Sequence, residues 1–147
     1  MEATNPSLQA LSALVGEWTT EATHPMVPST VVHGGSTVEW LEGERFLIAR
    51  ARLDHPAFPD SISIMGDTGG LRMHYFDSRG IARIYELTLD GVVWTFSRTA
   101  PDFSPLGFKQ RLTWTFSDDG RTIRGTSQIC EDDKTWKDDV QITSRRS

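Results

Sequence analysis

The sequence predicts an all-β fold: a closed antiparallel up-and-down barrel of about ten strands, preceded by a short N-terminal helix. Ten short runs of strand-forming residues follow one another between Gly16 and Thr143, and tight polar or glycine turns join most of them. No run after the N-terminal segment 1–15 has helical spacing. Such a meander most simply curls into a barrel, whose centre is either filled by side chains or occupied by one small ligand.

Composition limits the classes of protein to which the chain can belong. The 147 residues suit one domain over 1–147, and the 15 Lys and Arg against 20 Asp and Glu are scattered, which argues against a nucleic-acid-binding surface. Cys130 is the only cysteine, so an internal disulfide cannot form, and this fits a reducing compartment. The segment 1–15 has no basic residue before its short apolar stretch, as a secretory signal would, and the sequence has no long apolar run. We therefore expect a cytoplasmic protein that does not contact membranes.

Each element follows from a local pattern. Leu8, Leu11 and Leu14 stand at helical spacing and predict a short helix that plugs or flanks one end of the barrel. The first strand is expected to run from Gly16 to the proline-containing loop 24–29. The other strands are expected at 31–41, 45–53, 61–66, 71–76, 81–89, 92–98, 109–116, 122–129 and 135–143. Asp90-Gly91 favours a type I′ hairpin, because both residues tolerate positive φ.

Alternation along the strands predicts which side chains face the centre. Three strands place a polar residue in phase with large apolar ones: Arg98 with Trp94 and Phe96, Gln110 with Leu112, Trp114 and Phe116, and Asp138 with Trp136, Val140 and Ile142. Each polar group then lies either in water at a rim of the barrel, or inside it. A buried charge must be paired or bound to a ligand.

Three strands leave their orientation open. If Phe46 faces inward, Arg50 projects into the cavity, where its guanidinium could bind a carboxylate or phosphate; if Leu47 faces inward, Arg50 is a solvated surface group. The strands 71–76 and 81–89 are equally ambiguous. They carry Tyr75 and Tyr85, whose hydroxyl groups could orient a ligand in a mainly apolar pocket.

No complete catalytic, metal or cofactor motif stands out, and no cofactor is predicted. No two of the four histidines are two or four residues apart, so the local spacing of a metal site is missing. His24 and His55 each precede a proline in a predicted loop and are expected to be exposed. His74 is the best candidate for a titrating or ligating role, because it lies within a strand beside Tyr75.

Several motifs resemble a known superfamily. Gly16-Glu17-Trp18, directly after the short helix, resembles the Gly-x-Trp opening of the calycins, which include lipocalins and fatty-acid-binding proteins. Four further stretches are similar to the domain-of-unknown-function 1579-like family of small bacterial proteins: Glu39-Trp40-Leu41-Glu42-Gly43, Arg45-Phe46-Leu47-Ile48, Met73-His74-Tyr75-Phe76-Asp77-Ser78-Arg79-Gly80 and Asp118-Asp119-Gly120-Arg121-Thr122-Ile123.

The resemblance spans nearly the whole chain and implies a closed calycin barrel. It also implies that Trp18 packs near the floor, often against a basic residue at the end of the last strand, here Arg145 or Arg146. The haem-binding nitrobindins resemble the chain in layout and use a histidine near the C-terminal end as the iron ligand. Because the sequence has no histidine after His74, it departs from that pattern.

The sequence favours a binding module over an enzyme. We expect a small hydrophobic molecule, or an amphipathic one with an anionic end, inside the barrel. The predicted site combines aromatic walls with three polar residues, of which the two arginines would neutralise the anionic end: Trp40, Tyr75, Tyr85, Trp94, Phe96 and Trp114, with Arg50, Arg98 and His74.

Two alternatives stay open. The first is a small barrel enzyme, an isomerase or cyclase acting on a hydrophobic substrate, in which His74 or Tyr85 moves a proton beside Arg50. The second is a filled barrel that serves as a structural module or forms a homodimer. That alternative predicts no cavity, and an apolar outer patch that includes Leu47 and Leu53.

Overall fold

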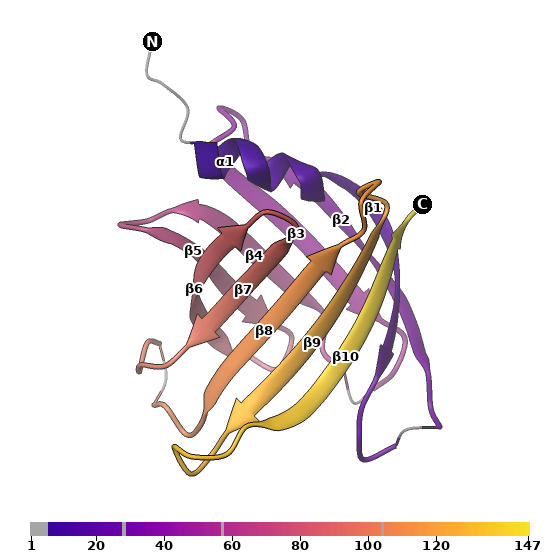
Figure 1. Ribbon diagram of the computed structural model, residues 1–147, viewed down its shortest axis with the longest axis vertical. Helices are drawn as coiled ribbons and strands as arrows, with labels where there is room; N and C mark the ends of the chain where they lie inside the picture. Colours follow the sequence, from indigo (N-terminus) through magenta and orange to yellow (C-terminus); the bar gives the residue numbers. More distant parts are fainter. Residues whose placement is uncertain (1–5, 28, 57, 104) are drawn as a thin grey trace.

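The computed structural model describes residues 6–147 except Pro28, Ala57 and Ser104 (Figure 1). Its ten strands form one closed antiparallel barrel, in which each strand pairs with its sequence neighbours and β1 closes the ring against β10. The predicted fold class is therefore confirmed. Within the described residues, no helix is long and apolar enough to cross a membrane.

The elements fall close to the ranges expected from the sequence. They are α1 Pro6–Leu11, the 3₁₀ helix η1 Ser12–Leu14, β1 Gly16–Thr23, β2 Val32–Trp40, β3 Phe46–Leu53, β4 Ser61–Asp67, β5 Leu71–Asp77, β6 Ala82–Asp90, β7 Val93–Arg98, β8 Lys109–Phe116, β9 Thr122–Cys130 and β10 Lys137–Arg146. The largest difference is in β10, which begins two residues later than expected and ends three residues later.

One half of the barrel is filled. The helix α1 lies across the end at which the chain terminates, and the β1–β2 connection lies at the opposite end (Figure 1). Leu11 of α1 is fully buried, and the Nε1 of Trp18 donates a hydrogen bond to the Leu14 carbonyl oxygen at 2.9 Å. The core continues below the helix with Leu47, Met65, Trp94, Phe96 and Phe116.

The structure settles the orientation of the ambiguous strands. In β3, Leu47 is fully buried and Leu53 lines the interior, so Arg50 lies on the outer face. The expectation of an apolar outer patch that includes Leu47 and Leu53 is therefore wrong. In β5 and β6 the inner face carries Tyr75 and Tyr85.

A β-bulge in β10 overturns one predicted grouping. Asp138 pairs with Gln128 of β9 and Gln141 pairs with Thr126, so three steps along β10 match two along β9. The extra residue reverses the alternation. Asp138 therefore lies outside, where it accepts a hydrogen bond from the Nε2 of Gln128 at 3.1 Å, while Val140 faces the interior. Trp136 stacks on Arg111, 4.2 Å from its guanidinium carbon, and does not share a face with Val140 either.

Arg146 is the basic residue that packs on Trp18, with its guanidinium carbon 4.4 Å from the centre of the indole ring. Its Nη1 donates to the Val15 carbonyl oxygen at 2.6 Å, its Nε donates to the Gly120 carbonyl oxygen at 3.1 Å, and its Nη2 donates to the Ala13 carbonyl oxygen. One side chain at the end of β10 thus ties the helical segment to the β8–β9 turn.

We expect Arg146→Ala to lower the free energy of unfolding by about 2–4 kcal/mol, because it removes charge-assisted hydrogen bonds and a cation–π contact. Urea denaturation followed by circular dichroism measures the change. Arg145→Ala is the matched control: Arg145 is exposed and lies 3.8 Å from Glu21, so its loss should cost about 0.5 kcal/mol or less. Equal losses in the two variants would contradict this role of Arg146.

Candidate functional site

The open half of the barrel contains a cavity of about 700 Å³. Its lining comes from the inner faces of the strands and from the connections β1–β2 and β3–β4, at the end away from α1. The wall is mainly apolar and includes Leu53, Met73, Leu112, Ile129, Val140 and Ile142. Such a volume and lining are typical of sites for small organic ligands.

Three of the sequence-predicted site residues line this cavity: Tyr75, Tyr85 and Trp114. The rings of Tyr75 and Tyr85 meet edge to face, 6.4 Å apart. Trp94 and Phe96 belong to the filled half, where both are fully buried, and Phe96 supports Trp114 from behind at 4.6 Å between ring centres. Trp40 is half-buried against the core and does not reach the cavity.

The predicted polar residues lie elsewhere. Arg50 is exposed on the outer face, where its Nη1 donates to Glu39 Oε1 at 3.1 Å. His74 also lies outside the cavity, with its Nε2 3.0 Å from Thr68 Oγ1. Neither contributes to the interior.

Arg98 is buried, but it is paired within the protein. Its Nε and Nη2 donate to the two carboxylate oxygens of Asp102 at 2.8 and 2.9 Å, and this hydrogen bonding raises the pKa of Arg98. Asp102 also accepts the backbone N–H of Ile84 at 2.7 Å. The expectation that a buried charge needs a partner is confirmed, and the partner seen is a loop carboxylate.

The predicted site left out several charged and amide side chains that line the cavity: His24, Arg52, His55, Arg79, Arg83, Gln110 and Asp139. A signal existed for Arg83 and Gln110, since each alternates in phase with residues that face inward. The loop residues His24, His55 and Arg79 carry no such periodicity. Asp139 lines the cavity because of the β10 bulge, which no pattern in the sequence predicts.

Arg83 is half-buried on the inner face of β6, with its guanidinium carbon 5.7 Å from the ring centre of Phe108. Among the described residues, no carboxylate forms an ion pair with it. Burial raises the pKa of Tyr85, and the positive charge of Arg83 opposes that rise. A cation in this setting is suited to an anionic ligand group.

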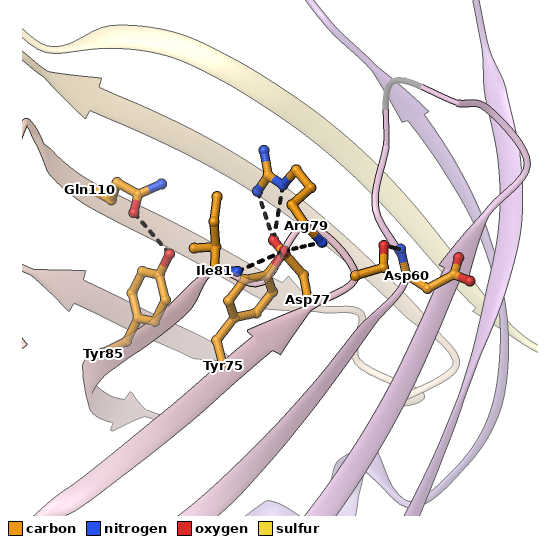
Figure 2. Close-up of polar contacts among 8 residues, drawn as sticks. Asp60, Tyr75, Asp77, Arg79, Ile81, Tyr85 and Gln110 are labelled. Atoms are coloured by element: carbon orange, nitrogen blue, oxygen red, sulfur yellow. Dashed lines mark hydrogen bonds and ion pairs between the residues drawn. The ribbon is translucent and has the colours of Figure 1, made fainter. Parts of the chain in front are cut away.

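A polar cluster at the β5–β6 turn is centred on Asp77, whose side chain is 0% exposed (Figure 2). The carboxylate accepts hydrogen bonds from Tyr75 Oη at 2.8 Å and from Arg79 Nη2 at 2.7 Å, and from the backbone N–H groups of Arg79 and Ile81. Burial favours the protonated acid, but these hydrogen bonds outweigh it and lower the pKa of Asp77.

The same cluster keeps Tyr75 neutral. Burial, followed by the hydrogen bond to Asp77, raises the pKa of Tyr75 far above its ordinary value. The Tyr75 hydroxyl donates its hydrogen bond to Asp77, and the same carboxylate neutralises the charge of Arg79. The cluster therefore fixes the turn and the orientation of the Tyr75 ring.

His24 joins the β1–β2 loop to the bulged part of β10. Its Nε2 lies 2.9 Å from Asp139 Oδ1, and its Nδ1 accepts the backbone N–H of Met26 at 3.1 Å. Because Nδ1 is an acceptor, Nε2 carries the proton and donates to Asp139. Both ring nitrogens are thus engaged, which suits a role in holding the mouth of the barrel rather than in accepting a proton from a substrate.

Comparison with known proteins supports the fold. Neither the protein-family models nor the curated proteins searched contain a match to the chain. Among solved structures, the crystal structure of Rv2717c from M. tuberculosis is similar, with a TM-score of 0.67, 16% sequence identity and coverage of 99% of both chains. At this identity the likeness concerns the fold alone. Together with the closed ten-stranded barrel, it fits a calycin-like fold.

We expect Asp77→Asn to lower stability by about 1–3 kcal/mol at pH 7, because a buried charged acceptor is lost. The pKa of Asp77 is lower in the folded protein than in the unfolded chain, so its contribution is complete above about pH 4 and disappears as the pH falls through the depressed pKa. The difference in Tm between wild type and variant should therefore shrink in acid.

Thermal denaturation followed by circular dichroism from pH 7 to pH 3 tests this. Asp118→Asn, at an exposed turn position, is the control and should leave Tm nearly unchanged at every pH. A difference between wild type and Asp77→Asn that stays constant down to pH 3 would contradict the role assigned to the ionised carboxylate.

Proposed function

We propose that the protein binds a small, largely apolar molecule with an anionic end in the open half of its barrel. The observation that carries this proposal is the half-buried Arg83, which lines an apolar cavity and has no ion-pair partner among the described residues. An anionic ligand group would supply that partner.

The apolar part of the ligand would be held by burial. The aromatic rings of Tyr75, Tyr85 and Trp114 and the aliphatic side chains around them offer a surface that favours hydrocarbon over water. Each Å² of apolar surface removed from water contributes about 25 cal/mol. A ligand that fills most of the cavity would therefore gain its affinity mainly from the apolar wall.

The anionic end would lie near the mouth, where the charge balance is positive. Arg52, Arg79 and Arg83 line the cavity against the single carboxylate of Asp139 within the described lining. Asp77 compensates Arg79, and Arg52 is exposed, so Arg83 offers the strongest interaction. A charge-assisted hydrogen bond gains strength where water is partly excluded.

The family assignment and the location are also proposals. We propose that the chain belongs to the domain-of-unknown-function 1579-like family, supported by the motifs quoted above, the calycin-like fold and the contact between Arg146 and Trp18. A cytoplasmic location is supported by the single cysteine, Cys130, which is buried as a free thiol.

Binding is favoured over catalysis because the residues suggested for proton transfer do not meet. His74 and Arg50 lie on the outer face, whereas Tyr85 lies in the cavity wall. The hydroxyl of Tyr85 already donates a hydrogen bond to Gln110, and burial raises its pKa.

A second proposal is that two copies of the protein associate through the outer face of β4 and β5. Ile62 and Phe76 are paired across these strands and are 42% and 41% exposed, and Phe103 is 59% exposed with its ring 6.1 Å from that of Phe76. The half-exposed Ile64 of β4 and Ile48 of β3, which pair with each other, extend this apolar surface, and Ile84 of β6 lies beyond His74. Contiguous apolar surfaces of this kind favour association.

The ligand proposal is tested with dodecanoate and dodecanol, which share a hydrocarbon chain but differ in charge. Calorimetry and quenching of tryptophan fluorescence should show that wild type prefers dodecanoate. Arg83→Gln should weaken dodecanoate binding about tenfold or more and leave dodecanol binding nearly unchanged, because only the charge-assisted contact is lost. Arg50→Gln, on the outer face, is the control and should bind like wild type.

Two results would overturn the ligand proposal. One is that neither compound binds the wild-type protein. The other is that Arg83→Gln and Arg50→Gln bind dodecanoate equally well, which would mean that the anionic end is not held by Arg83.

For association, we expect wild type to be dimeric in size-exclusion chromatography with light scattering, at protein concentrations of about 100 μM, where weak homodimers are populated. Phe76→Lys should be monomeric, because it places a charge in the middle of the apolar face. Thr115→Lys, an exposed position on β8, is the control and should remain dimeric. A monomeric wild type refutes this second proposal.

A further inference from the structure

Gln110 is a polar side chain in the wall of the cavity. It lies near the beginning of β8, on the same inner face as Leu112 and Trp114, and it is only 7% exposed. An amide buried to this extent is costly unless its donors and its acceptor find partners.

The contact with Tyr85 fixes how this amide is turned. Tyr85 Oη donates to Gln110 Oε1 at 3.0 Å, and Tyr85 is itself packed edge to face on Tyr75. In Figure 2 the amide oxygen of Gln110 points at the tyrosine hydroxyl, and the amide nitrogen points away from it. The carbonyl end is therefore occupied, and the NH₂ end is presented on the other side.

The NH₂ group has no protein partner in the described part of the chain. Every fully buried side-chain nitrogen or oxygen there has a hydrogen-bond partner. The amide nitrogen of Gln110 must therefore keep some accessible surface, and the space that this residue borders is the cavity. The NH₂ group is thus available to whatever occupies the cavity.

We propose that the Gln110 amide binds an oxygen acceptor of the ligand, so that the ligand is an oxygenated amphiphile: a carboxylate whose hydrocarbon chain carries a hydroxyl or carbonyl oxygen near the charged end. This inference rests on the proposed function, because it assumes a ligand whose anionic end lies at Arg83. Tyr85 acts as a positioning residue that keeps the amide turned toward the cavity.

The placement of the donors supports a second oxygen close to the first. Arg83 and Tyr85 are two residues apart on the inner face of β6, which corresponds to about 7 Å along the strand. The guanidinium and the NH₂ group both donate and cannot accept, so both select oxygen. A plain alkyl chain would leave the Gln110 donors unpaired, and sites of this kind discriminate against ligands that lack the acceptor.

The experiment compares dodecanoate with its 2-, 3-, 4- and 5-hydroxy derivatives, which share length and charge. Calorimetry on the wild-type protein should show that at least one hydroxy acid binds about tenfold more tightly than dodecanoate, since one hydrogen bond to a buried donor is gained.

Three variants assign that preference. Gln110→Met keeps the length of the side chain but removes its N–H donors. It also leaves the Tyr85 hydroxyl without its acceptor, so the double variant Tyr85→Phe with Gln110→Met removes that hydroxyl as well. In both variants the preference for the hydroxy acid should disappear, while dodecanoate still binds. Tyr85→Phe alone should reduce the preference without abolishing it, because the amide remains but is no longer held.

Binding of dodecanoate by each variant also shows that its cavity is intact. If wild type binds dodecanoate and every hydroxy acid equally, the role of Gln110 is refuted while the proposed function stands. If the preference survives in the double variant, another group binds the hydroxyl oxygen of the ligand, and this inference is also refuted. If no compound binds the wild-type protein, the proposed function fails, and the role of Gln110 fails with it.

Discussion

The pairing of β1 with β10 is the constraint on which the rest of the structure depends. Residues from Trp18 to Thr23 pair with residues from Gln141 to Arg146, so the first and last strands complete a ring with no free edge. Closure at ten strands also sets the width of the interior. Side chains and the helix α1 fill that width at one end, and at the other end a hollow of about 700 Å³ is left.

Buried and half-buried polar contacts hold the mouth of this hollow in shape. Asp77 ties the β5–β6 turn to Tyr75, Asp102 ties the β7–β8 connection to Arg98, and Asp139 ties the β1–β2 loop to β10. In each case a carboxylate joins a loop to a side chain of the wall or of another loop. The cavity is therefore framed by ion pairs and hydrogen bonds. Among the described residues, Arg83 has no ion-pair partner, and the amide nitrogen of Gln110 has no hydrogen-bond partner.

Local patterns predict much of the fold, because period-2 alternation and glycine turns act over a few residues. The order of the strands, a tight hairpin between β6 and β7 and the closed barrel follow from them. The type I′ turn expected at Asp90-Gly91 is wrong: Asp90 pairs with Val93, the two residues between them are Gly91 and Val92, and of these only Gly91 has a positive φ. Local patterns predict less of the site, for two physical reasons. In β3 both faces are partly apolar, so only packing against the core turns Leu47 inward and Arg50 outward. In β10 one extra residue reverses the alternation, and a bulge has no reliable signature in a single sequence.

The division of the barrel into a packed end and an empty end separates two demands that compete in most small proteins. Trp94 and Phe96 belong to the core and do not line the cavity, whereas Ile129 and Ile142 line the cavity and lie outside the core cluster; Met73 and Tyr85 belong to both. Natural selection can thus exchange residues such as Ile129 and Ile142 with little penalty in folding, in the way that many unrelated activities come to share one scaffold. A barrel built in this way is well suited to diversification, because related chains can keep the packed end and change the residues that line the cavity.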